Sequence, residues 1–412
     1  MTRWDALVAI CGSLRAGLLG GERRSADNVR WDLAIEIASF HLVTPALAWC
    51  LRDEPMPEDV GEYFSSVAAL NRQRNAQMLA GLDRVTAALN AVDIEPVLLK
   101  GCAILAEGLY PDPSLRMMGD ADVLIPRERA ADAVAALTRA GFATKTSDVL
   151  VPPGHHHLQM LHDPDSGLCL ELHTDVVSTA PGAIVATDWF CEHARPLTFR
   201  NQRVRIAEPT RNAAHGIFHS QLFHGLLSRN KIHLRYLLDL ALIRARHAAA
   251  IDWAELDGRF CAAGFGEALA TYLHFAEALF GQPMPKLTHA PRPGALAELR
   301  SVESRDSFHA QIEWLKECHD VLQTELSRVM LERDRLQVEA ERSRAADAAL
   351  QAELDTVSRT HGDLERERAR MLTSRSWRWT RPLRTLVAAL RRLGFWREQA
   401  VGRPEQTFTP PP

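Results

Sequence analysis

A long stretch without helix breakers constrains this chain more than any other feature. No proline occurs between Pro293 and Pro382, and after Gly294 only one glycine, Gly362, interrupts it. Proline and glycine are the residues that most often end helices, so this stretch predicts one long helix. With Ile312 at heptad position a, eight of nine d positions are apolar: Leu315, Leu322, Val329, Leu336, Leu350, Val357, Leu364 and Met371, Ser343 being the exception. The pattern predicts a coiled coil over residues 303–372.

The seam of this coiled coil is weakened by polar residues at several a positions, which are His319, Arg333, Asp347, His361 and Arg368. Polar a positions lower stability but favour one register and one oligomeric state. We therefore expect a homodimer through residues 303–372. The alternative is a single solvated helix stabilised by charge pairs along its surface.

A basic tail follows the coiled coil. Residues 373–397 contain seven arginines and no acidic residue, with Trp377, Trp379 and Trp396 among them. Arginine and tryptophan together are typical of segments that lie on an anionic membrane surface. Two alternatives stay open. The tail could cap the acidic coiled coil, or it could bind RNA by stacking and charge.

Composition places the rest of the protein among ordinary globular chains. Its 412 residues suffice for two or three domains, and the net charge of -4 creates no overall field that would attract nucleic acid. Seven scattered cysteines without a CxxC pair suit a reducing cytoplasm. No run of about 18 apolar residues is present. We expect a cytoplasmic protein, peripheral at the inner face of the cell membrane if the tail binds lipid.

Hydrophobic periodicity divides the chain into six parts. Apolar residues at helical spacing fill 29–51 and 70–92, whereas short apolar strands at 96–99 and 121–125 alternate with helices at 102–109 and 128–140. A hairpin is expected at 157–162 and 168–176. The parts are a helical region (1–92), an α/β domain with a mixed sheet (93–208), a second helical region (209–290), a linker (291–302), the coiled coil (303–372) and the basic tail (373–412).

Two aspartates lead directly into the second of these strands. Side chains alternate along a strand, so Asp120 and Asp122 point to the same side, about 6–7 Å apart along the backbone. Carboxylates so placed repel each other unless a cation lies between them, and hard oxygen ligands suit Mg²⁺ or Mn²⁺. A solvated turn is the usual explanation of an isolated Asp-x-Asp, but here Asp122 opens a buried strand.

A third acid would complete a two-metal site for phosphoryl transfer. Glu171 is the candidate, because the apolar residues beside it face the core and its own side chain must face the other way; His173 and Asp175 share that face. Lys100 and Gly101 end one strand and open a helix, where a phosphate can approach the backbone closely. Lys100, one of only five lysines, could supply a charge to a triphosphate, and Arg116 a second one.

These motifs together resemble the uncharacterised nucleotidyltransferase family of the polymerase-β-like superfamily in bacteria. The resemblance covers about residues 30–245 and rests on Leu98-Leu-Lys-Gly101, Tyr110-Pro-Asp-Pro113, Leu115-Arg116, Gly119-Asp-Ala-Asp-Val-Leu124, Leu170-Glu-Leu-His173 and Arg235-Tyr-Leu-Leu-Asp239. It implies a nucleotidyltransferase-like mixed sheet in an α/β (α+β) fold. The chain departs from the usual Gly-Ser or Gly-Gly, having Lys100-Gly101-Cys102 instead.

The same resemblance implies an activity. Asp120 and Asp122 would bind Mg²⁺ or Mn²⁺, and Glu171 would be the third metal-binding carboxylate, which helps to activate an acceptor hydroxyl. Lys100, Gly101 and Arg116 would bind the nucleotide. The implied reaction transfers NMP from an NTP substrate to a hydroxyl acceptor and releases pyrophosphate.

The tail carries a second resemblance. Residues 374–384 look like the segment that follows coiled coils in bacterial polysaccharide glycosyltransferases, which suggests a role in envelope polysaccharide biosynthesis. The competing hypothesis is a non-catalytic scaffold that keeps the fold and acts through residues 303–397. The histidines at 155–157 are expected to be solvated, and His215 and His219 to be hydrogen-bonded at an interface. Walker A, GxGxxG and GxSxG motifs are absent, so kinases, dehydrogenases and serine hydrolases have no support.

Overall fold

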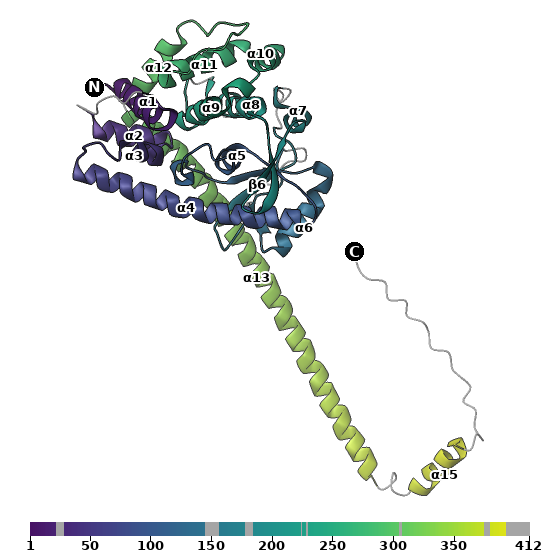
Figure 1. Ribbon diagram of the computed structural model, residues 1–412. Coiled ribbons are helices and arrows are strands. Elements are labelled where there is room, and N and C mark those ends of the chain that lie inside the picture. Colours follow the sequence, from purple (N-terminus) through teal and green to yellow (C-terminus); the bar gives the residue numbers. More distant parts are fainter. Residues whose placement is uncertain are drawn as a thin grey trace. The chain divides into compact units, whose positions relative to one another are not determined.

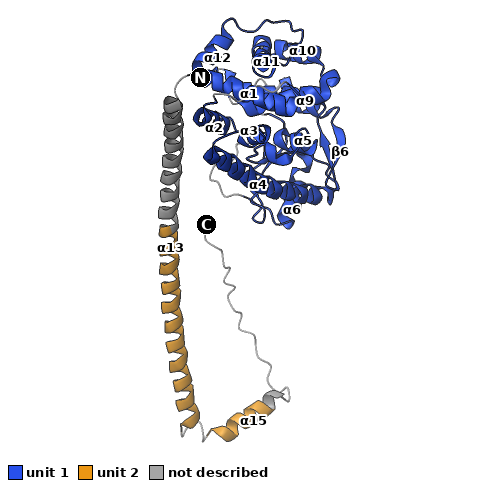
Figure 2. Cartoon of the chain, turned by 60° about the vertical axis from the view of Figure 1, so that its left-hand side comes forward, with its two compact units in different colours: residues 1–310 blue, residues 311–412 orange. Residues whose placement is uncertain are grey.

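The computed structural model describes residues 1–21, 29–144, 156–177, 184–223, 225–227, 230–304, 307–374 and 380–392 (Figure 1). Within these ranges, side chains are not described at 307–336, 338 and 390–392. The chain divides into two compact units, residues 1–310 and 311–412 (Figure 2). The six parts expected from the sequence stay a prediction.

The first unit begins with four helices. These are α1 (Arg3–Leu19), α2 (Trp31–Phe40), α3 (Thr44–Leu51) and α4 (Glu58–Asn90). Helix α4 starts directly after Pro57, a residue that cannot donate a helical hydrogen bond, and it is longer than the periodicity at 70–92 indicated. The helix expected over 29–51 is broken, because Leu42 has a φ of 56°. The break turns α3 so that it packs against α1 and α4.

A mixed seven-stranded sheet forms the centre of this unit. Its strands are β1 (Val97–Leu98), β2 (Ala121–Leu124), β3 (Ala143–Thr144), β4 (Leu161–His162), β5 (Cys169–His173), β6 (Arg195–Phe199) and β7 (Gln202–Ile206). They follow the order β3-β4-β5-β2-β1-β7-β6. Strand β2 is parallel to β5, β1 is parallel to β7, and the other neighbours are antiparallel. The fold class expected from the sequence is confirmed, as is the β4–β5 hairpin.

Helices cover both sides of the sheet. Helix α4 contacts β7 and α6 (Ala130–Arg139), whereas α5 (Lys100–Ala106) contacts β2 and α8 (Pro209–Phe218). In Figure 1, α4 lies below the sheet and α8 above it. The helix expected over 210–246 is interrupted, because α8 ends in a π-helical turn (His219–Phe223) and α9 (Leu234–His247) begins later.

Short elements and a final helical group complete the unit. They are the 3-10 turns η1 (Pro113–Leu115), η2 (Arg127–Arg129) and η6 (Ala248–Ala250) and the helices α7 (Thr187–Cys191), α10 (Trp253–Ala262), α11 (Gly266–Phe280) and α12 (Ala295–Ser304). One continuous apolar core runs from α1 through the sheet to α12. The strands around Asp122 therefore lie within a continuously packed core.

The second unit is dominated by α13 (Ser307–Thr373), followed by α15 (Arg381–Arg392). The long helix expected from the sequence is confirmed. Its described d positions Leu350, Val357, Leu364 and Met371 are 71%, 62%, 60% and 55% exposed in the single chain. The coiled coil itself stays a prediction. Among the described helices, none combines the length and apolar character needed to span a bilayer.

Candidate active site

Strand pairing brings two of the predicted acids together. Asp122 lies within β2 and Glu171 within the parallel neighbour β5, and the two residues are directly in register. Residues in register on neighbouring strands point to the same side of the sheet. Asp120 lies immediately before β2 and lines the same pocket as these two residues. The sheet therefore gathers three carboxylates that are up to 51 positions apart in the sequence.

Asp122 is the most constrained of the three. Its side chain is 5% exposed, and Oδ1 accepts hydrogen bonds from Lys100 Nζ at 2.7 Å and His173 Nε2 at 3.0 Å. Burial alone would raise the pKa of the carboxyl. The positive charge of Lys100 and the hydrogen bond from His173 outweigh burial and hold the pKa of Asp122 well below its usual range. The fold therefore keeps Asp122 ionised.

Lys100 reaches this carboxylate from an unusual backbone conformation. Its φ is 46°, in the left-handed region that side-chain-bearing residues seldom adopt, at the turn from β1 into α5. Burial would lower the pKa of Lys100, but the charge of Asp122, its hydrogen bond and the charges of Glu171 and Asp120 together outweigh burial and raise it. The ammonium and the carboxylate thus stabilise each other's charged forms.

Asp120 has a different environment. It is half-buried, and the pKa of its carboxyl is raised by burial and by the negative charges of Asp122 and Glu171, with Lys100 and Arg235 opposing them in part. Like-charge repulsion at Asp120 is therefore not fully compensated within the protein. A bound cation would relieve it.

The donor set fits a divalent cation. One oxygen each from Asp122 and Glu171 and one ring nitrogen of His173 lie within 4.8 Å of one another. Nε2 of His173 also lies 3.5 Å from Glu171 Oε2. Burial would lower the pKa of His173, but its hydrogen bonds to Asp122 and Glu171 and the charge of Asp122 raise it. Carboxylate oxygens suit Mg²⁺ or Mn²⁺. His173 could ligate a metal through Nε2 only after this nitrogen loses the proton that it donates to Asp122, and an imidazole ligand favours transition metals such as Mn²⁺ over Mg²⁺. Asp120 stands outside this compact group but beside it in the pocket.

Arg116 also lines the pocket, but an internal carboxylate holds most of its guanidinium. Its Nε and Nη2 donate to Asp239 at 2.7–3.1 Å, and Tyr110 Oη donates to the same carboxylate at 2.9 Å. The remaining nitrogen, Nη1, lies against the α-carbon of Gly101, where a Cβ atom would overlap it. Glycine at position 101 therefore makes room for Arg116.

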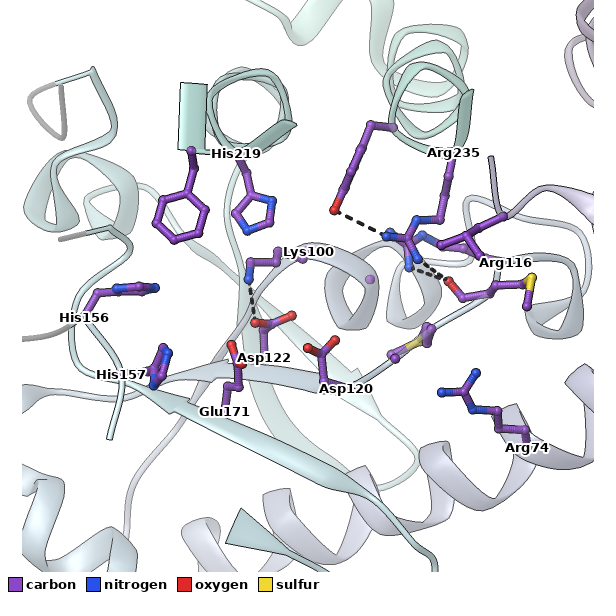
Figure 3. A pocket seen from close by; sticks show the side chains of 17 residues that line it. Arg74, Lys100, Arg116, Asp120, Asp122, His156, His157, Glu171, His219 and Arg235 are labelled. Atoms are coloured by element: carbon purple, nitrogen blue, oxygen red, sulfur yellow. Dashed lines mark hydrogen bonds and ion pairs between the residues drawn. The ribbon is translucent and has the colours of Figure 1, made fainter. Parts of the chain in front are cut away.

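The whole cavity has a volume of about 490 Å³ and contains all six residues predicted from the sequence. This volume suits a small-molecule ligand. In Figure 3 the three carboxylates lie at the centre, with Arg74, Arg116 and Arg235 on the right and His156 and His157 on the left.

Several further residues line this pocket that the sequence did not assign to the site, namely Arg74, His156, His157, His219, Phe223, Arg235 and Tyr236. The expectation that the 155–157 histidines are solvated is wrong for His156, which is 5% exposed and packs against His173. His155 lies outside the described residues. No motif or spacing in the sequence marks Arg74 or His219 as a residue of the site.

Comparison with known proteins identifies a family. Residues 27–281, more than half of the chain, match the model of a family described as "Uncharacterised nucleotidyltransferase". No curated protein matches the chain.

Two solved structures show weaker likeness. The solution structure of the antibiotic-resistance factor ANT(2'')-Ia is 11% identical, covers 49% of this chain and 98% of its own, and has a TM-score of 0.32. The crystal structure of an antigenic nucleotidyltransferase-like protein from Paracoccidioides brasiliensis is 17% identical, covers 50% and 99%, and has a TM-score of 0.30. Such low TM-scores support no argument about this chain.

Proposed function

Since the chain belongs to the uncharacterised nucleotidyltransferase family, we propose that it transfers NMP from an NTP to a hydroxyl acceptor in a reaction that requires Mg²⁺ or Mn²⁺. The observation that carries this proposal is the placement of Asp120, Asp122 and Glu171 in one cavity that basic residues also line. Carboxylates that hold cations, next to basic groups that hold phosphates, are what phosphoryl transfer requires.

The residues divide the chemistry between them. Asp122, Glu171 and Asp120 would hold the divalent cations, which when bound neutralise the triphosphate and the developing charge. The acceptor oxygen attacks the α-phosphorus, a new O–P bond forms, and the bond from the α-phosphorus to the bridging oxygen breaks, so that pyrophosphate leaves. Glu171, 18% exposed, is the carboxylate that we assign to orient the acceptor hydroxyl and receive its proton.

Lys100, Gly101 and Arg116 form the wall that we assign to the nucleotide. Lys100 Nζ donates to Asp122 Oδ1, so it would be placed to move from the carboxylate to a phosphate oxygen when metal and nucleotide enter. Arg116 would turn Nη1 to a phosphate, since the hydrogen bond from this nitrogen to the carbonyl of Met117 is 3.5 Å long and Asp239 holds the other two nitrogens in place. Gly101 gives that nitrogen its space.

The second unit bears on oligomeric state and location. We assign the exposed d positions of α13 to a homodimer, and α15 to contact with an anionic membrane surface. Together with the resemblance of the tail to polysaccharide glycosyltransferases, this suggests an acceptor in envelope polysaccharide biosynthesis. A non-catalytic scaffold is the competing function.

Incubation with α-labelled NTPs tests the reaction. Each of the four NTPs is supplied with Mg²⁺ or Mn²⁺ and a cell lysate as the source of acceptor, and transferred label is measured. Glu171→Gln should keep NTP affinity but lose transfer, because its carboxylate acts mainly in the transition state. An unchanged transfer rate in Glu171→Gln contradicts its assigned role, and absence of NTP binding by the wild-type protein favours the scaffold.

A further inference from the structure

The four basic residues that line the cavity differ in what holds them. Lys100 is paired with Asp122, and Arg116 with Asp239. Arg74 and Arg235 make no ion pair with any carboxylate among the described residues of the chain. Both point toward the same side of the carboxylate cluster in Figure 3, opposite His156 and His157. The cavity therefore holds two arginine charges that no carboxylate in the described part of the chain neutralises with an ion pair.

Arg235 is held in place by uncharged groups. Its Nη1 donates to the carbonyl of Met117 at 3.0 Å, Nη2 donates to Tyr236 Oη at 3.3 Å, and the guanidinium lies 5.0 Å from the Tyr236 ring centroid. The third nitrogen, Nε, is buried without a hydrogen-bond partner. Its charge acts on Asp120, whose pKa it helps to lower against burial and the neighbouring acids. Arg235 is thus oriented but not neutralised.

Arg74 lines the cavity from α4, and two asparagines beside it hold this part of the helix against residues 113–116. Asn71 Nδ2 donates to the carbonyl of Ser114 at 2.5 Å, and Asn75 Nδ2 donates to the carbonyls of Pro113 and Arg116 at 2.7 Å each. Both asparagines are buried. They tie α4 to the segment that leads into β2, so the neighbouring Arg74 is delivered to the edge of the cavity although its own side chain is exposed.

We propose that Arg74 and Arg235 bind the β- and γ-phosphates of the nucleotide, and so hold the pyrophosphate that leaves. The proposal rests on the nucleotidyl transfer proposed above. Guanidinium groups are planar donors that match phosphate oxygens bidentately, and they stay protonated at any physiological pH. A triphosphate brought next to three carboxylates needs positive charge beyond that of the bound cations. Arg74 and Arg235 supply it on one side of the cluster.

Binding of magnesium pyrophosphate, measured by isothermal titration calorimetry on the full-length protein, tests the assignment. Arg74→Ala and Arg235→Ala should each weaken pyrophosphate and NTP binding about 10-fold or more, since hydrogen bonds to charged groups contribute that much. Binding of the matching NMP should change less than about twofold. Arg72→Ala is the matched control, because Arg72 is exposed on the same helix but does not line this cavity.

Conservative variants keep the test independent of folding. Arg235→Lys and Arg74→Lys retain charge but lose the planar fork, so pyrophosphate affinity should fall between those of the wild-type protein and the alanine variants. If the alanine variants bind pyrophosphate as Arg72→Ala does, or lose NMP affinity equally, the assignment is overturned while the proposed function stands. If the wild-type protein binds neither pyrophosphate nor any NTP, the proposed function fails as well.

Discussion

Asp120 and Asp122 are two residues apart, yet the same substitution should shift protein stability in opposite directions. In the absence of divalent metal, we expect Asp122→Asn to destabilise the fold and Asp120→Asn to stabilise it slightly. The reason is that the native structure favours the ionised form of Asp122 and disfavours that of Asp120. This prediction concerns the free energy of unfolding and is independent of catalysis.

The magnitude for Asp122 follows from its ion pair. Lys100 is 18% exposed and Asp122 5% exposed, and their charged atoms are 2.7 Å apart. Removing one partner of a buried pair typically costs about 3–5 kcal/mol, because the other charge is left uncompensated. Glu171 and Asp120 remain close enough to stabilise the ammonium in part. We therefore expect a loss of roughly 2–3 kcal/mol, at or just below the lower end of that range.

For Asp120 the expected change is small and has the opposite sign. Its carboxyl is half-buried and faces Asp122 and Glu171, so an uncharged amide removes a repulsion that solvent already screens in part. A gain of up to about 1 kcal/mol is the scale of such partly exposed interactions.

Urea unfolding at pH 7 in EDTA, followed by circular dichroism, measures both effects. Asp132→Asn is a suitable control, because Asp132 is 59% exposed and pairs only at the surface with Arg129. Its effect should stay within about 0.5 kcal/mol. The folded-state pKa of Asp122 is lowered, so its stabilisation is present above its unfolded pKa and is lost as the pH falls. The difference between wild type and Asp122→Asn should therefore shrink below about pH 4.

Two results would refute this reasoning. One is an Asp122→Asn variant as stable as the wild-type protein in EDTA, which would mean that the Lys100 ion pair contributes nothing to the fold. The other is an equal loss in Asp120→Asn, which would mean that both carboxylates are structural. In a separate titration, adding Mg²⁺ or Mn²⁺ should stabilise the wild-type protein by an amount that grows with metal concentration, and Asp122→Asn should lack this gain.

The other predictions concern the second unit and one buried histidine. Leu350→Asp with Leu364→Asp should lower the sedimentation coefficient of the full chain to that of a monomer; a monomeric wild type would favour the single solvated helix. Flotation of the wild-type protein with liposomes should rise with anionic lipid content and fall with salt. Leu383→Glu with Leu386→Glu, at residues 70% and 60% exposed on α15, should reduce this flotation. Equal binding by this variant would contradict membrane contact through α15. Burial lowers the pKa of His215 to about 3, so between about pH 6.5 and 3 the unfolded state binds a proton that the folded state does not. The free energy of unfolding should therefore fall with decreasing pH, by about 1.4 kcal/mol per pH unit from this residue. His215→Gln should reduce this pH dependence. An unchanged pH dependence would contradict the assigned role of His215.

Local sequence patterns predicted the elements around the site well. The buried strand β2 contains Asp122 and the start of the apolar run that follows it, and the turn-forming residues at 163–167 lie between β4 and β5. The long helix α13 follows from the absence of proline. These features depend on residues that are neighbours in the chain, because strand alternation, turn propensity and helix breaking act over a few residues.

Pairings between distant segments depended on the tertiary structure. From the sequence, Lys100 was expected to bind a triphosphate, whereas in the fold it pairs with Asp122, 22 positions away. The fold also pairs Arg116 with Asp239, 123 positions away. Arg74 and Arg235 entered the cavity only because α4 and α9 pack at its edge. No periodicity in a single sequence reports which helix lies beside which strand.

The sequence by itself predicted a strand that begins beside Asp120 and contains Asp122, and a second strand from which Glu171 projects, because side-chain direction follows from strand alternation. Only the tertiary structure decided that β2 and β5 are parallel neighbours with Asp122 opposite Glu171. It also decided that Lys100 and His173 share Asp122 as their acceptor. The physical reason is that strand order and register are set by the packing of the whole core, to which residues across the entire first unit contribute.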